Sequence, residues 1–138
     1  MDIKLFIATK AFVNYQGRIL ILRESAKYSD GSNAGRYDVV GGRLIPGQKF
    51  DESLLREIKE ETNLTIRFGK PFYVGEWRPV IKGNKCQIVG VFFECFADSN
   101  IVILSEDHDK YEWIDPENYR EYDIITNLAD AFEAYLKR

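Results

Sequence analysis

Residues 56 to 62 carry three acids at helical spacing, Glu57, Glu60 and Glu61. On an α-helix these side chains fall within one arc of roughly 100°. Like charges at such spacings destabilise an isolated helix by about 0.2–0.5 kcal/mol per pair. A divalent cation relieves this repulsion, and hard cations prefer oxygen ligands. The stretch therefore predicts a helix that binds a hard divalent cation.

The acids belong to a longer segment, 50–62, in which apolar residues recur with the helical period. Leu54, Leu55 and Ile58 form the apolar side of this predicted helix. Asn63 follows it and is expected to be a left-handed C-cap.

A short strand is predicted at 37–40, just before Gly41 and Gly42. A turn at 46–47 then precedes the acidic helix. Glycine lets a backbone bend sharply and approach a ligand closely. We expect this strand–loop–helix unit to hold a metal-bound phosphate.

The rest of the chain predicts a sheet with further helices. Loops are expected at 24–36 and 105–110, and a hairpin turn at 82–85. Strands and short extended segments are expected at 5–15, 18–23, 66–79, 86–97, 101–104 and 111–114.

A helix is predicted to begin near Asp115, with Pro116 at its first position. The last helix is expected at 124–136, and its apolar face comprises Leu128, Phe132, Tyr135 and Leu136. The pattern indicates a single α/β domain over residues 1–138, with a mixed central sheet and helices on both sides.

Charge and hydropathy exclude some classes of partner. The 138 residues carry a net charge of −3, which argues against a nucleic acid polymer as the main partner. A nucleotide remains compatible with this charge, because a metal can supply the positive charge. Residues 1–9 contain no long apolar core that follows basic residues, so we expect no signal peptide. No apolar run approaches about 18 residues, so we expect no membrane span.

Cys86 and Cys95 lie nine residues apart in one predicted strand. The odd separation places them on opposite faces, too far apart for a disulfide. They are expected to be free thiols in a reducing compartment, and hence in a cytoplasmic protein.

Simpler interpretations exist for each feature. The three glutamates alone could form a solvated helix face. His108 is the only histidine of the sequence, so a Ser–His or Cys–His nucleophile is poorly supported. Its acidic neighbours indicate an exposed loop. Trp77 and Trp113 are expected to pack in the core. Tyr37 and Arg36, just before the glycines, are substrate-binding candidates by position.

The frame around the acids resembles the signature of the Nudix (MutT-like) hydrolase family. The family has Glu where this chain has Gln48, and Gly where it has Asn63. The matching positions are Gly42, Arg56, Glu57, Ile58, Glu60, Glu61 and Leu64. The segment 37–42 and the late segment 111–117 are also similar to the family's. The resemblance covers nearly the whole chain and implies a Nudix-like α/β/α sandwich.

The resemblance implies a hydrolase that uses Mg²⁺ (or Mn²⁺) to cleave the diphosphate linkage of a nucleoside diphosphate derivative. Candidate substrates are a dNTP, a nucleotide sugar or ADP-ribose, and Pro79 is weakly consistent with the last. Many members are dimers, so a homodimer is a possible assembly.

The resemblance also assigns roles to residues. Glu57, Glu60 and Glu61 would hold the metal, and a backbone carbonyl at Gly41 or Gly42 would complete its shell. Arg56 would orient Glu57. The general base stays open between Glu57 and the late acids Glu106, Asp107 and Glu112.

The two departures from the signature have unequal weight. Asn63 tolerates the left-handed conformation that the family's glycine adopts. Gln48 can accept a hydrogen bond from Arg56 but cannot make the charge-assisted version. The alternative function is therefore a catalytically weak module that binds or senses a nucleotide.

Overall fold

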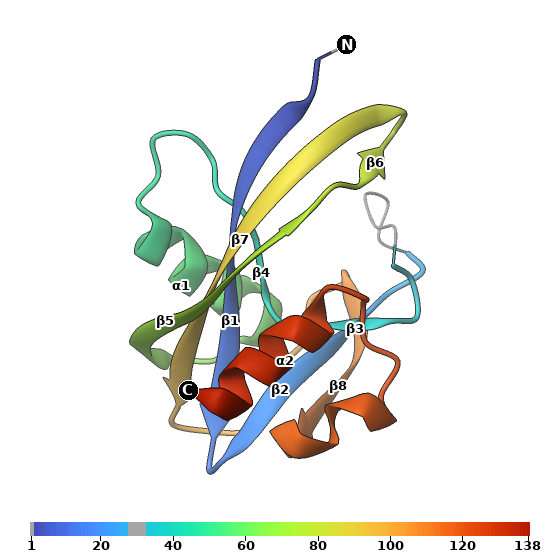
Figure 1. Cartoon of the computed structure of the whole chain (residues 1–138). Coiled ribbons are helices and arrows are strands. Elements are labelled where there is room, and N and C mark those ends of the chain that lie inside the picture. Colours follow the sequence, from blue (N-terminus) through green and yellow to red (C-terminus); the bar gives the residue numbers. More distant parts are fainter. Residues whose placement is uncertain (1, 28–32) are drawn as a thin grey trace.

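The structure is a computed structural model that describes residues 2–27 and 33–138 (Figure 1). Residues 28–32 of the predicted loop at 24–36 lie outside the described residues. The strands are β1 (Lys4–Tyr15), β2 (Arg18–Glu24), β3 (Tyr37–Asp38), β4 (Gly41–Arg43), β5 (Ile66–Trp77), β6 (Val80–Ile81), β7 (Asn84–Ala97) and β8 (His108–Ile114). The helices are α1 (Phe50–Thr62), the 3₁₀-helix η1 (Pro116–Glu121) and α2 (Leu128–Lys137).

The described strands form a mixed sheet with the main order β3-β2-β1-β7-β5. The central pair β1–β7 is parallel, from Lys4 opposite Cys86 to Asn14 opposite Phe96. The other pairings are antiparallel: β2 with β1, β3 and β8, β4 with β1, and β5 and β6 with β7. The predicted mixed sheet is confirmed.

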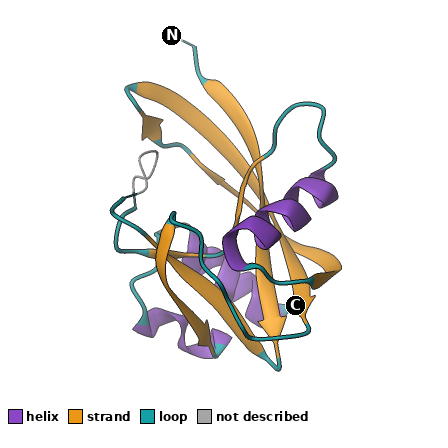
Figure 2. Ribbon diagram, turned by 180° about the vertical axis from the view of Figure 1, so that it is seen from behind, coloured by secondary structure: helices purple, strands orange, loops and turns teal. Residues whose placement is uncertain are grey.

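Hydrophobic residues alternate along the central strands and cover both faces of the sheet. Phe12, Ile19 and Ile21 pack with α2 in one core. Their chain neighbours Val13 and Leu20 pack with α1 in a second core. Successive strand residues point to opposite faces, so this spacing requires a helix on each side. Figures 1 and 2 show α2 and α1 on opposite faces of the sheet, which confirms the predicted sandwich.

Helix α1 has the predicted bounds and the predicted end. Asn63 adopts the left-handed conformation (φ 60°, ψ 13°), and its N–H donates to the carbonyl of Lys59. Leu54 and Ile58 are fully buried, whereas Leu55 is 39% exposed, so its placement on the apolar side was wrong. The cap fixes where the chain leaves the helix, and the buried residues fix which side of it faces the pocket described below.

The tight turns and most strands agree with prediction. Lys82 and Gly83 both have positive φ in the β6–β7 hairpin, as a two-residue turn requires. Trp77 and Trp113 pack against the two cores, as expected. Cys86 and Cys95 are buried free thiols.

Two boundaries were wrong by three residues or more. The extended segment predicted at 101–104 is not a strand of the sheet, and its Ile101 and Ile103 are exposed. Strand β8 begins at His108 rather than at 111, because its first residues pair with the end of β2 across a bulge. Helix α2 begins at Leu128 rather than at 124, because the Ile125 N–H donates to the carbonyl of Tyr37 instead of entering a helix.

The predicted apolar face of the last helix is correct for Leu128, Phe132 and Tyr135, which are buried. Leu136 is 40% exposed, so its assignment to that face was wrong.

None of the helices in the described part of the chain is long and apolar enough to cross a membrane.

Candidate active site

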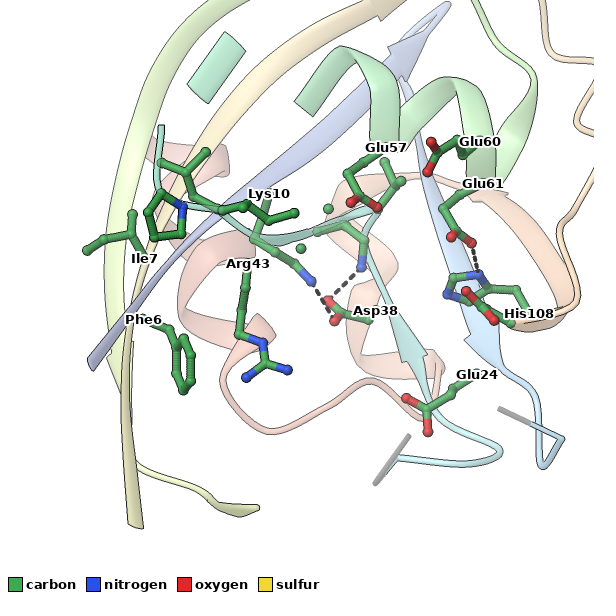
Figure 3. A pocket seen from close by; sticks show the side chains of 18 of the residues that line it. Phe6, Ile7, Lys10, Glu24, Asp38, Arg43, Glu57, Glu60, Glu61 and His108 are labelled. Carbon is green, nitrogen blue, oxygen red and sulfur yellow. Dashed lines mark hydrogen bonds and ion pairs between the residues drawn. The ribbon is translucent and has the colours of Figure 1, made fainter. Parts of the chain in front are cut away.

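A cavity of about 960 Å³ lies where β4 and the acid-bearing side of α1 meet the loop before β8 (Figure 3). We call it the acid pocket. Glu57, Glu60 and Glu61 line it, together with Gly41 and Gly42. The structure therefore brings the three predicted helix acids and the two glycines together in one concave site.

Glu57 lies directly against the β4 backbone. A Cβ placed on Gly42 would lie 3.6 Å from the Glu57 carboxylate, an ordinary van der Waals contact, so Glu57 packs directly on this residue. Burial and the negative charge of Glu60 raise the pKa of Glu57. The carboxylate is thus crowded by negative charge, and a nearby cation would favour its ionised form.

Glu61 is held by two side chains from the loop and the strand that follow it. The Ser105 hydroxyl donates to Glu61 Oε2 at 2.7 Å, and His108 Nδ1 lies 2.8 Å from the same oxygen. Burial opposes ionisation, but the hydrogen bonds from His108 and Ser105 outweigh it and lower the pKa of Glu61. Glu61 is therefore the most firmly oriented of the three acids.

His108 was wrongly expected in an exposed loop. It opens β8, and its side chain is only 19% exposed. Glu24 pairs with His108 next to the β2–β8 bulge, and this pairing places His108 at the pocket. No local sequence pattern predicts this, because the contact depends on a strand pairing between distant parts of the chain.

Among the late acids, Asp107 is the one that lines the acid pocket. Burial and the charge of Glu61 raise the pKa of Asp107. Glu106 is exposed, and Glu112 lies on β8 with its carboxylate 3.8 Å from Lys110 Nζ. Of the three late candidates for a general base, the geometry favours Asp107.

Arg56 lies beside the acids, outside the pocket lining. Its guanidinium lies 3.6 Å from Glu57, 3.8 Å from Glu60 and 3.4 Å from the side-chain oxygen of Gln48, to which it donates. The expected contacts of Arg56 with Glu57 and Gln48 are therefore present. The Gln48 bond is long and neutral on the acceptor side, which makes it a weak one.

Tyr37 and Arg36 do not point into the acid pocket. Tyr37 is buried in the core on the α2 side, next to Tyr122. Arg36 pairs with Asp123 at 3.3 Å and donates to the carbonyl of Ile124. Both side chains tie β3 to the segment before α2, so their proximity to the glycines in sequence was misleading as a sign of substrate contact.

Lys10 and Asp38 form an ion pair on the pocket wall that sequence analysis missed. Lys10 Nζ lies 2.7 Å from Asp38 Oδ2, and the Val39 N–H donates to the other carboxylate oxygen. The Lys10 side chain is only 11% exposed. A lone lysine in an apolar strand carries no motif, so only its position beside β4 identifies it.

Gly41 makes room for this arrangement. Its φ is +146°, and a Cβ there would lie 2.2 Å from the carbonyl oxygen of Thr9 and 3.1 Å from Cδ of Lys10. The glycine thus allows β4 and the Lys10 side chain to pass close to each other.

The acid pocket offers oxygen atoms of the kind that bind a hard cation. Its anionic groups are carboxylate oxygens, the type that Mg²⁺ and Mn²⁺ prefer, and burial together with the charge of Glu60 raises the pKa of Glu57. Within residues 2–27 and 33–138, no three His, Cys, Asp or Glu side chains are gathered closely enough to hold a metal as they stand. Binding would therefore require these side chains to move toward a common point.

The sheet between two helices and the acid-lined pocket define a MutT-like hydrolase, and comparison with known proteins agrees. The NUDIX domain family model matches residues 7–135. The chain therefore belongs to the Nudix family, and its class is that of the pyrophosphohydrolases.

Individual relatives are similar over most of the chain. The nucleoside triphosphatase NudI of Escherichia coli (strain K12) is 28% identical over 110 residues, which cover 75% of this chain and 77% of NudI. The crystal structure of a MutT protein from Methanosarcina mazei Go1 superposes with a TM-score of 0.81 and 26% identity, covering 99% of this chain and 96% of that one. The E. coli ORF135 protein shares the fold with a TM-score of 0.72 at 19% identity, over 98% of this chain and 91% of its own.

Proposed function

We propose that this chain, acting as a single domain, hydrolyses the diphosphate linkage of a nucleoside diphosphate derivative with the help of Mg²⁺ or Mn²⁺. The observation that supports this most directly is the meeting of Glu57, Glu60 and Glu61 with the Gly41–Gly42 edge in one pocket. The similarity to NudI makes nucleoside triphosphates the first substrates to test.

The three helix acids would hold the cation, with the backbone carbonyl of Gly41 or Gly42 as a further ligand. A bound divalent cation neutralises diphosphate charge and activates water. Arg56 would keep Glu57 oriented through its 3.6 Å contact. Ser105 and His108 would do the same for Glu61.

The reaction also needs a carboxylate that accepts the proton of the attacking water. The new bond joins the water oxygen to phosphorus, and the bridging P–O bond of the anhydride breaks. Glu57 and Asp107 are the two candidates, since both line the pocket and both have a raised pKa. A carboxylate with a raised pKa is the stronger base.

The test measures anhydride cleavage with Mg²⁺ or Mn²⁺ across NTPs, dNTPs, nucleotide sugars, ADP-ribose and dinucleoside polyphosphates. We expect turnover of at least one class, and losses of about 100-fold or more in Glu57→Gln and Glu61→Gln. Glu52→Gln is the matched control, because Glu52 lies on the same helix but outside the acid pocket. Absence of cleavage across the panel with metal bound would contradict the proposal.

A second candidate is a module that binds a nucleotide without efficient turnover. The neutral, 3.4 Å contact between Gln48 and Arg56 favours it, because the family's acid at this position is missing. Thermal stabilisation by a nucleotide and a metal, without cleavage of that nucleotide, would support this candidate over the first.

A further inference from the structure

A second cavity lies at the end of the sheet that extends beyond both helices. It has a volume of about 240 Å³ and is bordered by the start of β1, by β4 and by the β6–β7 hairpin. We call it the basic cavity, and its lining residues are Lys4, Phe6, Arg43, Ile81, Lys82, Asn84 and Cys86. Figure 1 shows the hairpin and the start of β1 together at this end of the sheet, where β1 pairs with β7.

The basic cavity lies on the sheet face opposite the helix acids. Gly42 faces Glu57, and side chains alternate along a strand, so the next residue, Arg43, points to the other face. Arg43 pairs with Ala8 of β1, and Phe6 precedes Ala8 by two residues, so Phe6 shares that face. Figure 3 shows Arg43 and Phe6 beside each other and away from the helix acids.

Two cationic side chains border the same hollow. The Arg43 guanidinium lies 4.4 Å from the centre of the Phe6 ring, so it leans toward the start of β1 and is held there by the ring. Lys4 lies on the same face as Phe6, two residues earlier and about 7 Å away along the strand. Cys86 pairs with Lys4 from β7 and is buried, so it forms part of the floor between them.

The charges around the basic cavity are not balanced by the protein. Its lining contains Lys and Arg side chains, and no Asp or Glu is among the described residues that line it. Within residues 2–27 and 33–138, neither Lys4 nor Arg43 has a carboxylate at ion-pair distance. The arginines that do have one are Arg23, Arg36, Arg56, Arg78, Arg120 and Arg138. Like charges repel each other, so an anion between Lys4 and Arg43 would stabilise both.

Size and donor chemistry indicate which anion fits. Pockets for drug-sized ligands have volumes of about 300–1,000 Å³, so a cavity of 240 Å³ suits a smaller group. A phosphate group carries about two negative charges at pH 7, which two cations can neutralise. The planar guanidinium of Arg43 and the ammonium of Lys4 are both donors that bind phosphate oxygens. The side-chain amide of Asn84 adds a neutral donor at the rim.

We propose that the basic cavity is an anion site that binds a phosphate group through Lys4 and Arg43, without a metal ion. The phosphate is either a free inorganic anion or a group that the substrate carries away from the cleaved anhydride. The carboxylates of the acid pocket repel phosphate unless a cation is bound, whereas the basic cavity supplies the positive charge itself. The inference is independent of the proposed function, because this binding requires neither a metal nor hydrolysis.

The experiment titrates the protein with inorganic phosphate in metal-free buffer at constant ionic strength, and follows the backbone amides by NMR. We expect saturable shifts at residues 4–6, 43 and 81–86, with a Kd of about 10 mM or tighter. Lys4→Met and Arg43→Met should each weaken binding by about 3- to 10-fold, because one charged donor is lost. Lys4→Arg keeps the charge and should retain binding.

The chain offers matched controls for both cations. Lys85 lies on the same hairpin between Asn84 and Cys86, so it points to the other face of the sheet. Lys85→Met removes one charge outside the basic cavity and should change the Kd by less than about twofold, because salt screens distant charges. Arg67 also lies over an aromatic ring, 4.5 Å from the centre of Phe96, but outside the cavity. Arg67→Met should likewise leave phosphate binding unchanged.

A second titration, with Mg²⁺ and α,β-methylene ATP present, separates the two sources of phosphate. Binding of this nucleotide is first recorded from the amide shifts of Glu57 and Glu61. A higher apparent Kd for inorganic phosphate then assigns the cavity to a phosphate of the substrate, and an unchanged Kd assigns it to a free anion.

Three results would overturn the anion site, whether or not anhydrides are cleaved. The first is the absence of saturable shifts in metal-free buffer. The second is a set of shifts that lies outside the basic cavity. The third is an equal loss of affinity in Lys85→Met and Lys4→Met, which would show that phosphate responds only to net charge.

Discussion

His108 Nδ1 lies 2.8 Å from Oε2 of Glu61, the same oxygen that accepts the hydroxyl of Ser105. These two contacts fix the orientation of a carboxylate that the proposed function places on the metal. Groups that orient metal ligands typically change metal affinity by about 10- to 100-fold when they are removed.

His108→Ala is therefore expected to weaken Mn²⁺ binding by about 10- to 100-fold, measured by calorimetry or electron paramagnetic resonance without substrate. His108→Asn retains a side-chain hydrogen-bond donor and should recover part of the affinity. An unchanged Mn²⁺ affinity in His108→Ala would show that the contact does not support metal binding.

Gln48→Glu is expected to raise turnover. Arg56 would then bind a carboxylate instead of an amide oxygen, and a charge-assisted hydrogen bond is roughly twice as strong as a neutral one. We expect kcat to rise severalfold, about 3- to 10-fold, with a smaller change in KM. Gln16→Glu adds the same charge in the exposed β1–β2 turn and serves as the control. Equal kcat values for the natural chain and Gln48→Glu would mean that the missing acid does not limit the site.

Gly41→Ala is expected to destabilise the fold more than Gly47→Ala. Both glycines have positive φ, +146° and +92°, so alanine is strained at either position. A Cβ at Gly47 has no heavy atom within 4 Å, whereas one at Gly41 collides with the Thr9 carbonyl. We expect a loss of about 1–3 kcal/mol for Gly47→Ala and a larger loss for Gly41→Ala, measured by urea unfolding. Equal losses would show that β4 can move away from β1 at little cost.

Ionisation of the Tyr135 hydroxyl is expected to lower the free energy of unfolding at high pH. Burial and the hydrogen bond that its hydroxyl donates to Glu94 raise the pKa of Tyr135 to about 12, from 10.0 for a free side chain. The neutral phenol is thus favoured in the folded state. Its contribution is fully present below pH 10 and is lost as the pH rises through 12, to a total of about 2–3 kcal/mol.

The measurement is the free energy of unfolding as a function of pH from 8 to 12. Tyr135→Phe should flatten the decline above pH 10, because it removes the titrating group. Tyr111→Phe removes a more exposed tyrosine on β8 and should leave the decline as it is in the natural chain. A decline of the same slope in Tyr135→Phe would assign it to other groups.

The parts of the site that lie on one continuous element were predictable from sequence. Glu57, Glu60 and Glu61 follow from helical periodicity, and Asn63 follows from the conformations that asparagine tolerates. Gly41 and Gly42 were placed beside these acids by the spacing of the motif. Local rules suffice here because the helix and the strand before it are joined by a short connection.

The parts that depend on pairing between distant segments were not predictable in this way. His108 reaches Glu61 because β8 pairs with β2, and Lys10 reaches Asp38 because β1 pairs with β4, which follows Asp38 closely in the chain. The segment 124–127 has a helical pattern, but its backbone pairs with Tyr37 instead. In each case tertiary contacts decided a position that local sequence left open.

The parallel pairing of β1 with β7 also has a consequence for synthesis. The first long strand of the chain has its main partner in a segment that the ribosome makes only after α1 and β5. Until then, one edge of β1 exposes unpaired backbone groups and alternating apolar side chains. Such contacts between distant segments form slowly, and unpaired strands are prone to aggregate. We therefore expect the nascent chain to remain incompletely folded, and to gain most from chaperone protection, until residue 97 has left the ribosome.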